Sequence, residues 1–366
     1  MLSLGVEEEF FLADHASRAL TACAPVVVKR ARDLLGDGVT VELFPTMVEI
    51  RTRPVLTLTE LAAELRRVRA GVVAAAREAG CRVVASGTIL LPPPVLPEVS
   101  EQDRYLRLAA QFAPLVVGDQ GAAVCGCHIH LGVADRDEAV RLAGHLRPWL
   151  PTLQALAANS PYFRGRDSGY ASWRVMRWGN WPEAGPTPLV PDAAAYDALV
   201  DTLVRSRMLI DRRMVYWYAR PSEHVPTLEI RVADVNSDPD TVLLLAGLLR
   251  GLAVVLLAEI RRGVAAPVLV EPVLRAAHWL AAKDGLCGSA LDPVTGTLLP
   301  ADEAVERLMD RAAPGLAAAG DEQRVAELWE RLRATGDGAT RQRAAFRWRG
   351  ELRDVVDLLT LPEEPA

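Results

Sequence analysis

The segment Cys125–Gly132 (CGCHIHLG) places two cysteines and two histidines in alternating positions, which raises the question of a zinc site. Side chains along a β-strand point alternately to opposite faces. On a strand, Cys125 and Cys127 share a face with aliphatic residues. His128 and His130 share the other face with glycines, which leave room for a ligand. Because the ligands of one zinc ion must converge, this pattern disfavours a Cys₂His₂ site. Two alternatives remain: histidines that face a ligand, and two surface histidines on an edge strand.

Three further strand-like segments carry acidic residues on one face and apolar residues on the other. They are GVEEEFFL near the N-terminus, VELFPTMVEIRTRP, where we expect a bulge at Pro45, and TLEIRVADV. The charged residues on these faces are Glu7, Glu9, Glu42, Glu49, Glu229 and Arg231. A solvated sheet face would explain any one segment, but clustered carboxylates repel one another unless a cation lies among them. Four such strands therefore favour a site for Mg²⁺ or Mn²⁺, which prefer oxygen ligands and also bridge nucleotide phosphates.

The sequence lacks the usual phosphate-binding loops. It contains no GxxxxGK[ST] segment and no persuasive GxGxxG segment. Lysine occurs only at positions 29 and 283, so an anion site must be built from arginine side chains or backbone N–H groups. A nucleotide would therefore be held by a metal ion and by arginines.

The composition is that of an ordinary soluble protein. The chain has 366 residues, half of them hydrophobic, and a formal net charge of −6. It has no basic run with interleaved aromatic residues, which argues against a nucleic-acid partner. No repeat and no long low-complexity linker divides the chain, and we therefore expect a single domain over residues 1–366.

The cysteines and the N-terminus indicate a cytoplasmic protein. The five cysteines are an odd number without a CxxC pair, and the first residues, MLSLGVEEEF, turn acidic at once without a signal-peptide pattern. These features predict free thiols in a reducing compartment. Segment 241–260 has the length of a membrane span, but Arg250 at its middle would cost ~2.5–3.5 kcal/mol there. We therefore expect a buried helix and no membrane partner.

The strands that carry the polar residues are spread among helices. Alternation and β-branched content predict strands at 4–12, 39–52, 82–88, 123–133, 214–219 and 226–234. Apolar periodicity predicts helices at 22–35, 57–79, 102–116, 136–158, 192–212, 240–262, 272–283, 301–312, 321–334 and near 338–358. Long loops are expected at 90–100 and 173–191. Because the order shows no regular βαβ rhythm, we predict an α+β fold with a mainly antiparallel sheet.

Six segments of the chain resemble one known family. GVEEEF, ELFPTMVEIRT, DRYLRL, GCHIHLGV, ANSPYFRGRDSGYASWR and RPSEHVPTLEIRVAD occur in the order seen in the glutamate–cysteine ligase superfamily. They resemble most closely its bacterial carboxylate–amine ligase branch, also called glutamate–cysteine ligase type 2. The resemblance implies a glutamine-synthetase-like fold, in which the concave face of a curved, mainly antiparallel sheet holds ATP and two or three Mg²⁺ ions.

The resemblance also implies roles for individual residues. The metal ligands of the family match Glu7, Glu9, Glu42, Glu49, His128 and Glu229. Arg231 matches an arginine that contacts the transferring phosphate, so Glu229 and Arg231 are the implied catalytic pair. Arg174 and Arg220 are candidates for binding a substrate carboxylate or a phosphate, with a structural role as the alternative. His130 is a candidate for supporting the ligands.

One position departs from the family pattern. Many relatives carry a GTHP turn where this chain has GTILLPPP, so Ile89 replaces a histidine. If that histidine contributes to substrate recognition in relatives, the substrate of this protein differs from theirs.

Together these features predict an ATP-dependent carboxylate–amine ligase that forms an amide bond through an acyl phosphate. Its cofactors would be ATP and Mg²⁺, or Mn²⁺ in its place, and its partners a small-molecule acid and amine whose identity stays open. Residues 1–366 would form the catalytic domain, and a homo-oligomer is compatible with the sequence. Two alternatives remain: a metal-dependent hydrolase that uses the HxH pair of His128 and His130, and a nucleotide-binding relative without ligase activity.

Overall fold

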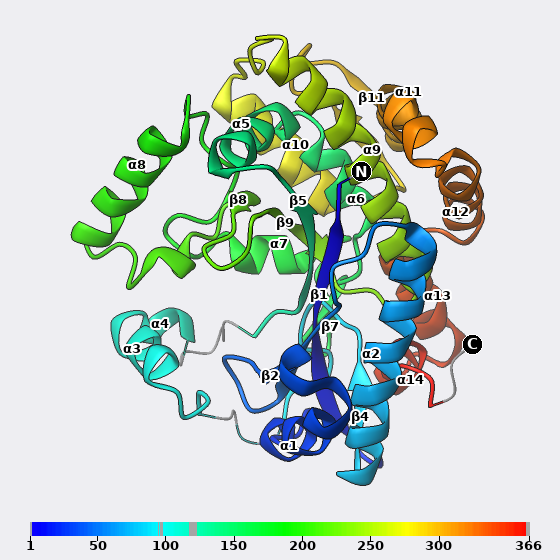
Figure 1. The fold of residues 1–366 in the computed structure, drawn as a ribbon. Coiled ribbons are helices and arrows are strands. Elements are labelled where there is room, and N and C mark those ends of the chain that lie inside the picture. The colour runs from blue at the N-terminus through cyan, green and yellow to red at the C-terminus, as the bar shows by residue number, and fades with distance from the viewer. Residues whose placement is uncertain (1, 94, 96–97, 117–122, 364–366) are drawn as a thin grey trace.

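A seven-stranded antiparallel sheet forms the centre of the molecule (Figure 1). The computed structural model describes residues 2–93, 95, 98–116 and 123–363. The strand order is β2-β3-β1-β5-β9-β8, and β4 also pairs with β1. The strands are β1 (Leu4–Asp14), β2 (Val39–Val41), β3 (Met47–Arg51), β4 (Cys81–Val84), β5 (Gly126–Gly132), β8 (Ala219–Pro221) and β9 (Thr227–Asp234). Two small ribbons pair β6 (Tyr162–Phe163) with β7 (Arg166–Asp167) and β10 (Ser289–Leu291) with β11 (Leu298–Pro300). The predicted α+β class with an antiparallel sheet is confirmed.

Helices surround this sheet. In chain order they are α1 (Ala24–Leu35), α2 (Leu58–Glu78), α3 (Asp103–Gln111), α4 (Ala113–Val116), α5 (Arg136–Leu146), α6 (Leu150–Leu156), α7 (Trp173–Trp178), α8 (Ala193–Arg205), α9 (Pro239–Arg261), α10 (Glu271–Asp284), α11 (Ala301–Ala319), α12 (Glu322–Thr335), α13 (Gly338–Arg349) and α14 (Leu352–Leu359). In the view of Figure 1, α3, α4 and α8 lie to the left of β1, whereas α2, α9 and α11 to α14 lie to its right. The helices predicted at 102–116, 136–158 and 338–358 are each divided into two.

The segment predicted as one strand with a bulge, 39–52, is a hairpin instead. β2 and β3 pair with each other in antiparallel register. The chain reverses between them at Pro45, whose ring lacks the N–H group that a strand ladder needs. The reversal places Glu42 directly after β2 and Glu49 within β3, so both carboxylates come to the same edge of the sheet.

Two segments around the expected 173–191 loop also differ from the prediction. The loop begins with the short helix α7, because the Ser172 side chain accepts a hydrogen bond from the Val175 N–H and caps the first turn. Residues 214–219 form a strand only at their end, where β8 begins. Before it, the chain packs its aromatic side chains inward: the Tyr216 ring lies 4.6 Å from the ring of Trp178, between centroids. Burial of these rings decides the local conformation more strongly than β-propensity does.

The apolar face of the sheet packs against α2 and α9. Val6, Ile129 and Ile230 of three neighbouring strands belong to one buried cluster with the leucines of α9. Among the described residues, α9 is the one helix whose length and composition would suit a membrane span, but 83% of its most apolar window is buried inside the protein. Arg250 is fully buried there and donates hydrogen bonds to the Asp321 carboxylate and the Leu56 carbonyl. The prediction of a buried core helix is confirmed.

Glu8 is the exception on this apolar face. Its carboxylate is 1% exposed and accepts hydrogen bonds from Nη2 (2.6 Å) and Nε (2.8 Å) of Arg69 on α2. Arg69 also donates to the carbonyls of Asn236 and Ser237, at 2.8 Å each. This ion pair therefore ties α2 to β1 and to the segment between β9 and α9.

Glu8→Gln should lower the free energy of unfolding by ~3–5 kcal/mol, because Arg69 would keep its charge in a buried site without a counter-charge. Urea denaturation measures the loss. The control is Glu303→Gln, which removes an ion pair between half-exposed side chains of α11 and should cost at most ~0.5 kcal/mol. Equal, small losses in both variants would contradict a stabilising role for the buried pair.

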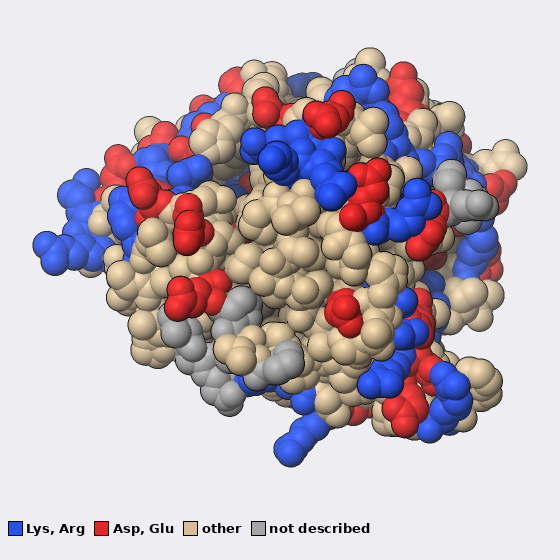
Figure 2. Space-filling view, turned by 90° about the horizontal axis from the view of Figure 1, so that it is seen from below, with Lys and Arg blue, Asp and Glu red and all other residues tan. Residues whose placement is uncertain are grey.

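On the surface, charges of both signs are mixed. Figure 2 shows the molecule from below, with Lys and Arg interspersed with Asp and Glu around a central area where neither predominates. This face therefore presents no continuous positive surface.

Candidate active site

A cavity of about 410 Å³ lies against the polar face of the sheet. Its floor consists of side chains from β1, β3, β5, β9 and β8, and α3 and the segment before β8 form its walls. The predicted residues that line it are Glu7, Glu9, Glu42, Glu49, His128, His130, Arg220, Glu229 and Arg231. All predicted site residues except Arg174 thus come together in one place.

Strand register brings these side chains next to one another. Glu9 on β1 lies directly opposite Glu49 on β3. Glu7 on the same strand lies opposite His128 on β5. On its other side from β1, strand β5 pairs with β9, which carries Glu229 and Arg231. The polar residues therefore form a continuous row across the middle of the sheet. Residues that are directly opposite in an antiparallel pair have Cβ atoms ~4.5–5.5 Å apart, so their functional groups can meet.

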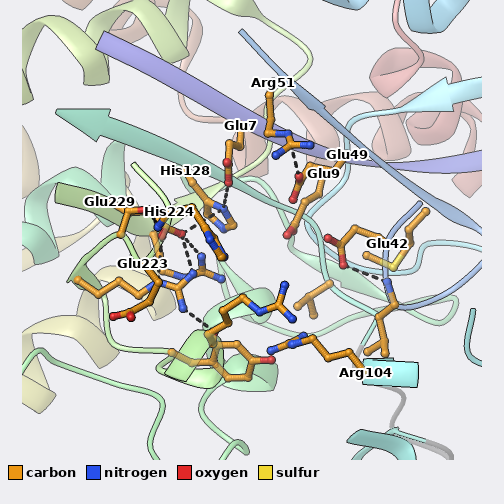
Figure 3. Close-up of a pocket in the computed structure, with 18 of the residues that line it drawn as sticks. Glu7, Glu9, Glu42, Glu49, Arg51, Arg104, His128, Glu223, His224 and Glu229 are labelled. Carbon is orange, nitrogen blue, oxygen red and sulfur yellow. Dashed lines mark hydrogen bonds and ion pairs between the residues drawn. The ribbon is translucent and has the colours of Figure 1, made fainter. Parts of the chain in front are cut away.

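Glu7, His128 and Glu229 form the first of two potential metal-binding groups (Figure 3). One ligand atom from each lies within 4.8 Å of the others. Nδ1 of His128 is 3.4 Å from a Glu7 oxygen and 3.7 Å from a Glu229 oxygen. Among the described residues, the buried Nε2 of His128 has no hydrogen-bond partner. Nδ1 is thus the nitrogen that lies near both carboxylates, while Nε2 has its lone pair or proton available to a ligand.

The charges of this first group are strongly perturbed. Burial alone would raise the pKa of Glu7, but hydrogen bonds to His128 and His130 outweigh it and lower that pKa below its ordinary range. Burial, together with the nearby Arg231 charge, lowers the pKa of His128 to about 4, so its imidazole is neutral at pH 7. A neutral imidazole beside ionised carboxylates is the form that binds a metal.

Glu9, Glu42 and Glu49 form the second group, and Figure 3 shows it beside the first. Their carboxylate oxygens also lie within 4.8 Å of one another. Burial and repulsion from Glu42 raise the pKa of Glu9 to about 8. Burial and repulsion from the other carboxylates raise the pKa of Glu49 well above its usual range. The protein thus holds three carboxylates closer together than their own charges favour.

Both groups fit a hard divalent cation. Mg²⁺ binds oxygen ligands at ~2.0–2.1 Å, which places neighbouring ligand atoms roughly 3–4 Å apart. The ligand atoms within each group lie within 4.8 Å of one another, close enough to converge on one cation. A bound cation would offset the electrostatic repulsion among the three carboxylates of the second group. The residues present therefore suit a divalent metal, and oxygen ligands with one histidine favour Mg²⁺ or Mn²⁺ over zinc.

Arg231 has hydrogen-bonding capacity left for a ligand. Its Nη1 donates to Glu229, while its buried Nε has no hydrogen-bond partner among the described residues. The guanidinium lies over two aromatic rings, with its central carbon 5.4 Å from the Trp178 centroid and 5.9 Å from that of Tyr216. The rings hold the guanidinium in place at the cavity wall. This geometry suits the predicted contact with a phosphate.

Arg220 is occupied by the protein itself. Its Nε and Nη2 donate to the Glu229 carboxylate at 2.9 and 3.2 Å, and its Nη1 donates to the carbonyls of Arg213 and Val215. Burial would raise the pKa of Glu229, but the charges of Arg220 and Arg231 outweigh it and hold that pKa well below its usual range. Of the two alternatives left open for Arg220, these contacts favour positioning Glu229.

Arg174 lies behind the cavity rather than on its lining. It is 2% exposed, and its two Nη atoms donate to the backbone carbonyl of Arg231 at 3.4 Å. Its guanidinium fills the space beside Gly126, where an added Cβ would lie 2.2 Å from Nη2. It is 3.9 Å from an oxygen of the buried Asp234. These contacts favour the structural alternative for Arg174.

His130 supports the first group without joining it. Its Nδ1 lies 2.8 Å from the Thr227 hydroxyl, and its Nε2 lies 3.6 Å from a Glu7 oxygen. Within the described part of the chain, neither potential metal group contains a second histidine. The HxH pair therefore does not supply the two-histidine ligand set on which the hydrolase alternative depends.

Several cavity residues were not singled out from the sequence. They are Arg51, Arg104, Tyr105, Trp178, Trp181, Arg213, Tyr216 and Glu223. The segment DRYLRL contains Arg104 and Tyr105, and the Tyr105 hydroxyl lies 3.5 Å from Glu42. The predicted loop at 173–191, whose tryptophans suggest a substrate unlike glutamate and cysteine, contributes Trp178 and Trp181 to the cavity. In contrast, Ile89 is 5% exposed and does not line the cavity, so it makes no direct contact with a ligand there.

Cys125 and Cys127 belong to the hydrophobic core, as the face assignment predicts. They are 0% and 1% exposed and lie in separate apolar clusters. Replacing both with serine should leave metal content unchanged and lower the free energy of unfolding by ~1–3 kcal/mol for each buried hydroxyl without a partner. Mass spectrometry of bound metal and urea denaturation measure the two effects. The exposed Cys287→Ser is the control, and loss of metal with the fold retained would refute the structural role.

Comparison with known proteins shows relatives along the whole chain. Residues 3–358 match the family described as "Glutamate-cysteine ligase family 2". A protein of Saccharopolyspora erythraea named "Putative glutamate--cysteine ligase 2-1" is 43% identical over 368 residues, covering 100% of this chain and 96% of that protein.

Two solved structures share the fold. A bifunctional glutathione synthetase from Pasteurella multocida matches 98% of this chain with a TM-score of 0.73 and 15% identity, although the match spans only 51% of that longer chain. A glutamate–cysteine ligase from Francisella tularensis in complex with AMP matches 98% of this chain and 87% of its own, with a TM-score of 0.66 and 12% identity. The sheet and its surrounding helices are therefore a fold that these two distant proteins share.

Proposed function

Because the chain belongs to glutamate–cysteine ligase family 2 and is accordingly an ATP-dependent carbon–nitrogen ligase, we propose that it forms its amide bond through an acyl phosphate in the cavity on the sheet. The observation that carries this proposal is the arrangement of two acidic groups beside Arg231 in one cavity. Carboxylates that bind divalent cations, together with an arginine that keeps a free donor, suit phosphoryl transfer from ATP. The catalytic domain would comprise residues 1–366.

In the proposed reaction, a carboxylate oxygen of the acid attacks the γ-phosphorus of ATP, and ADP leaves. The amine then attacks the acyl carbon, and phosphate leaves with the oxygen that came from the acid. The protein supplies no nucleophile, so its contribution is positioning and electrostatic stabilisation. Mg²⁺ held by the two acidic groups would neutralise charge on the phosphates.

The residues around Arg231 have complementary tasks in this scheme. Arg231 binds equatorial phosphate oxygens with its planar fork, which a lysine cannot reproduce. Arg174 holds the backbone of Arg231 from behind, and Arg220 holds Glu229 from the side. The aromatic rings of Trp178 and Tyr216 restrict the guanidinium to one orientation. The charge that develops in the transition state therefore meets donors that are already in place.

An acid labelled with ¹⁸O in its carboxylate tests the intermediate. With ATP, Mg²⁺ and an amine, one labelled oxygen should appear in the released phosphate, and mass spectrometry should detect the amide. ADP release and amide formation without label in the phosphate would exclude an acyl phosphate. Acid-dependent ADP release without any amide would support the nucleotide-binding alternative instead.

The substrates of the named relatives, glutamate and cysteine, are the first to test, but we propose an altered specificity. Trp178 and Trp181 place aromatic surface on the cavity wall, and the Trp181 ring lies 5.4 Å from that of Tyr216. Such a wall favours a substrate with an apolar or aromatic part. In a screen of acids and amines by ADP release, a pair of that kind should outperform glutamate with cysteine. Formation of γ-glutamylcysteine at a kcat of about 1–10³ s⁻¹ would refute the altered specificity.

A further inference from the structure

Two cysteines that the proposed reaction does not use lie in contact where α1 and β4 begin. Sγ of Cys23 is 2.7 Å from Sγ of Cys81. Cys23 immediately precedes α1 and is half-buried, whereas Cys81 is the first residue of β4 and is 2% exposed. A disulfide bond is ~2.05 Å long, so closing it requires the sulfurs to approach by only roughly 0.7 Å.

Cys81 also lines a second cavity, of about 380 Å³, which is separate from the candidate active site. Arg18, Arg77 and Arg82 line this cavity and face two carboxylates, Asp357 and Glu363. Arg18 and Arg82 share Asp357, while Arg77 lies 3.7 Å from Glu363 and is 61% exposed. The arginines therefore outnumber the carboxylates, and the cavity favours binding of an anionic ligand beside the buried thiol of Cys81.

We propose that Cys23 and Cys81 are an oxidisable dithiol that forms a disulfide with an anionic, low-molecular-weight disulfide entering the basic cavity. The thiol of Cys23 donates a hydrogen bond to the sulfur of Cys81, which lowers the pKa of Cys81 and favours Cys81 over Cys23 as the attacking sulfur. Cys81 is among the residues that line the cavity, so a disulfide bound there would lie next to it.

The exchange balances in two steps. The Cys81 thiolate attacks one sulfur of the small disulfide, forms a mixed disulfide and releases one small thiolate. The Cys23 sulfur then attacks Cys81, closes the protein disulfide and releases the second small thiolate. The two protons of the protein thiols go to the two thiolates, so one disulfide is reduced while the dithiol is oxidised.

The disulfide would link the two ends of a segment that carries part of the active site. Its loop includes α1, the β2–β3 hairpin and α2, and therefore Glu42 and Glu49. Closing a loop of this length restricts the unfolded chain and should raise the Tm of a protein of this size by about 5 °C. The dithiol thus links the redox state of the surroundings to the stability of the metal-binding edge of the sheet.

The test treats the native full-length protein with oxidised glutathione at neutral pH. Titratable thiols should fall from the five in the sequence to three, and peptide mass mapping should show a Cys23–Cys81 cross-link, 2 Da lighter than the dithiol. Dithiothreitol should restore the thiols and remove the gain in Tm. Reaction confined to the exposed Cys287, with Cys23 and Cys81 still reduced, would overturn the proposal.

Matched variants separate the thiol chemistry from the cavity charge. Cys23→Ser should abolish the cross-link and the gain in Tm, whereas Cys287→Ser should keep both. Arg77→Gln removes an exposed cavity charge and should slow the reaction with oxidised glutathione several-fold, but not the reaction with uncharged hydroxyethyl disulfide. Equal rates for both reagents in the unmodified protein and in Arg77→Gln would overturn the role of the basic cavity. These readouts do not depend on ligase activity.

Discussion

Replacing Arg231 with lysine should lower turnover at least ~10²-fold while weakening ATP binding only modestly. Lysine keeps the positive charge but lacks the planar fork that binds two phosphate oxygens at once. The loss matches that of removing one donor aimed at transition-state charge. Its structural basis is that Arg231 keeps an unpartnered Nε on the cavity wall, among the described residues, while Trp178 and Tyr216 fix its orientation. Steady-state kinetics and nucleotide titration measure the two effects.

Arg220→Lys is the matched control for this prediction. Arg220 also contacts Glu229, but its Nη1 donates to backbone carbonyls and not to a ligand. We therefore expect a smaller loss of turnover, within about tenfold. Glu229→Gln keeps the shape of the side chain but removes a ligand charge, and it should weaken Mg²⁺ dependence and turnover together. Near-full activity of Arg231→Lys on the true substrates would show that the phosphate role is wrong and would favour a solvated sheet face.

Glu49→Gln should make the metal-free protein more stable and the enzyme at least ~10²-fold slower. In the metal-free state, burial and repulsion from Glu7, Glu42 and Glu9 raise the pKa of Glu49 well above its usual range, so folding at neutral pH costs the free energy of protonating it. A glutamine avoids that cost and should raise Tm by roughly 1–4 °C. The same change removes a ligand of the second group, which weakens Mg²⁺ binding. The stabilisation that added Mg²⁺ gives should therefore shrink, because that gain depends on affinity. Thermal unfolding with and without Mg²⁺ measures the expected rise in Tm of the metal-free protein and the smaller gain from Mg²⁺. Steady-state kinetics measures the expected loss of turnover.

Glu223→Gln is the control for the Glu49 variant. Glu223 also lines the cavity, but it pairs with Arg136 and Arg212 and belongs to neither acidic group. It should leave the Mg²⁺-dependent gain in Tm unchanged. If Glu49→Gln destabilised the metal-free protein and left that gain intact, the second group would not be a cation site.

Proton release on Mg²⁺ binding is an independent test of whether the second group is a cation site. The pKa of Glu9 is raised to about 8 by burial and by repulsion from Glu42, so this carboxyl is mostly protonated at pH 7. A cation binds the ionised form, so Mg²⁺ binding at pH 7 should release protons and strengthen as pH rises toward 8. Calorimetry in two buffers of different ionisation enthalpy detects the release, and the share that comes from Glu9 should shrink as pH rises through about 8.

The strand pattern alone predicted the polar and apolar faces of the sheet. Alternation along a strand is a local property of the backbone, so it separated Glu7 and Glu9 from Val6, Glu8 and Phe10 on the other face without knowledge of the fold. The same alternation assigned Cys125 and Cys127 to the core, and both are buried there. Glu8 also follows the alternation, but its buried partner on α2 lies 61 residues away and was not visible in the pattern.

The resemblance to a known family supplied what alternation could not. It named the six ligand candidates, and the structure gathers all of them at one cavity. It assigned Arg231 to the transferring phosphate but left Arg174 and Arg220 between a binding role and a structural role, because a motif does not show what a side chain contacts. Position and contacts distinguish them in the structure: Arg220 is engaged with Glu229 and backbone carbonyls, and Arg174 lies off the cavity lining. Arg231 lines the cavity and, among the described residues, has an Nε without a partner.

What the sequence determined by itself was therefore which residues share a face, which helix is buried and which family the motifs resemble. Only the tertiary structure decided how the acidic residues divide into two groups. That division depends on strand pairing: Glu7 meets His128 across 121 residues, and Glu42 reaches Glu9 only because the chain reverses at Pro45. The contact between Cys23 and Cys81 has the same origin. Such contacts arise from the register and packing of distant segments, which the backbone pattern of any one segment does not contain.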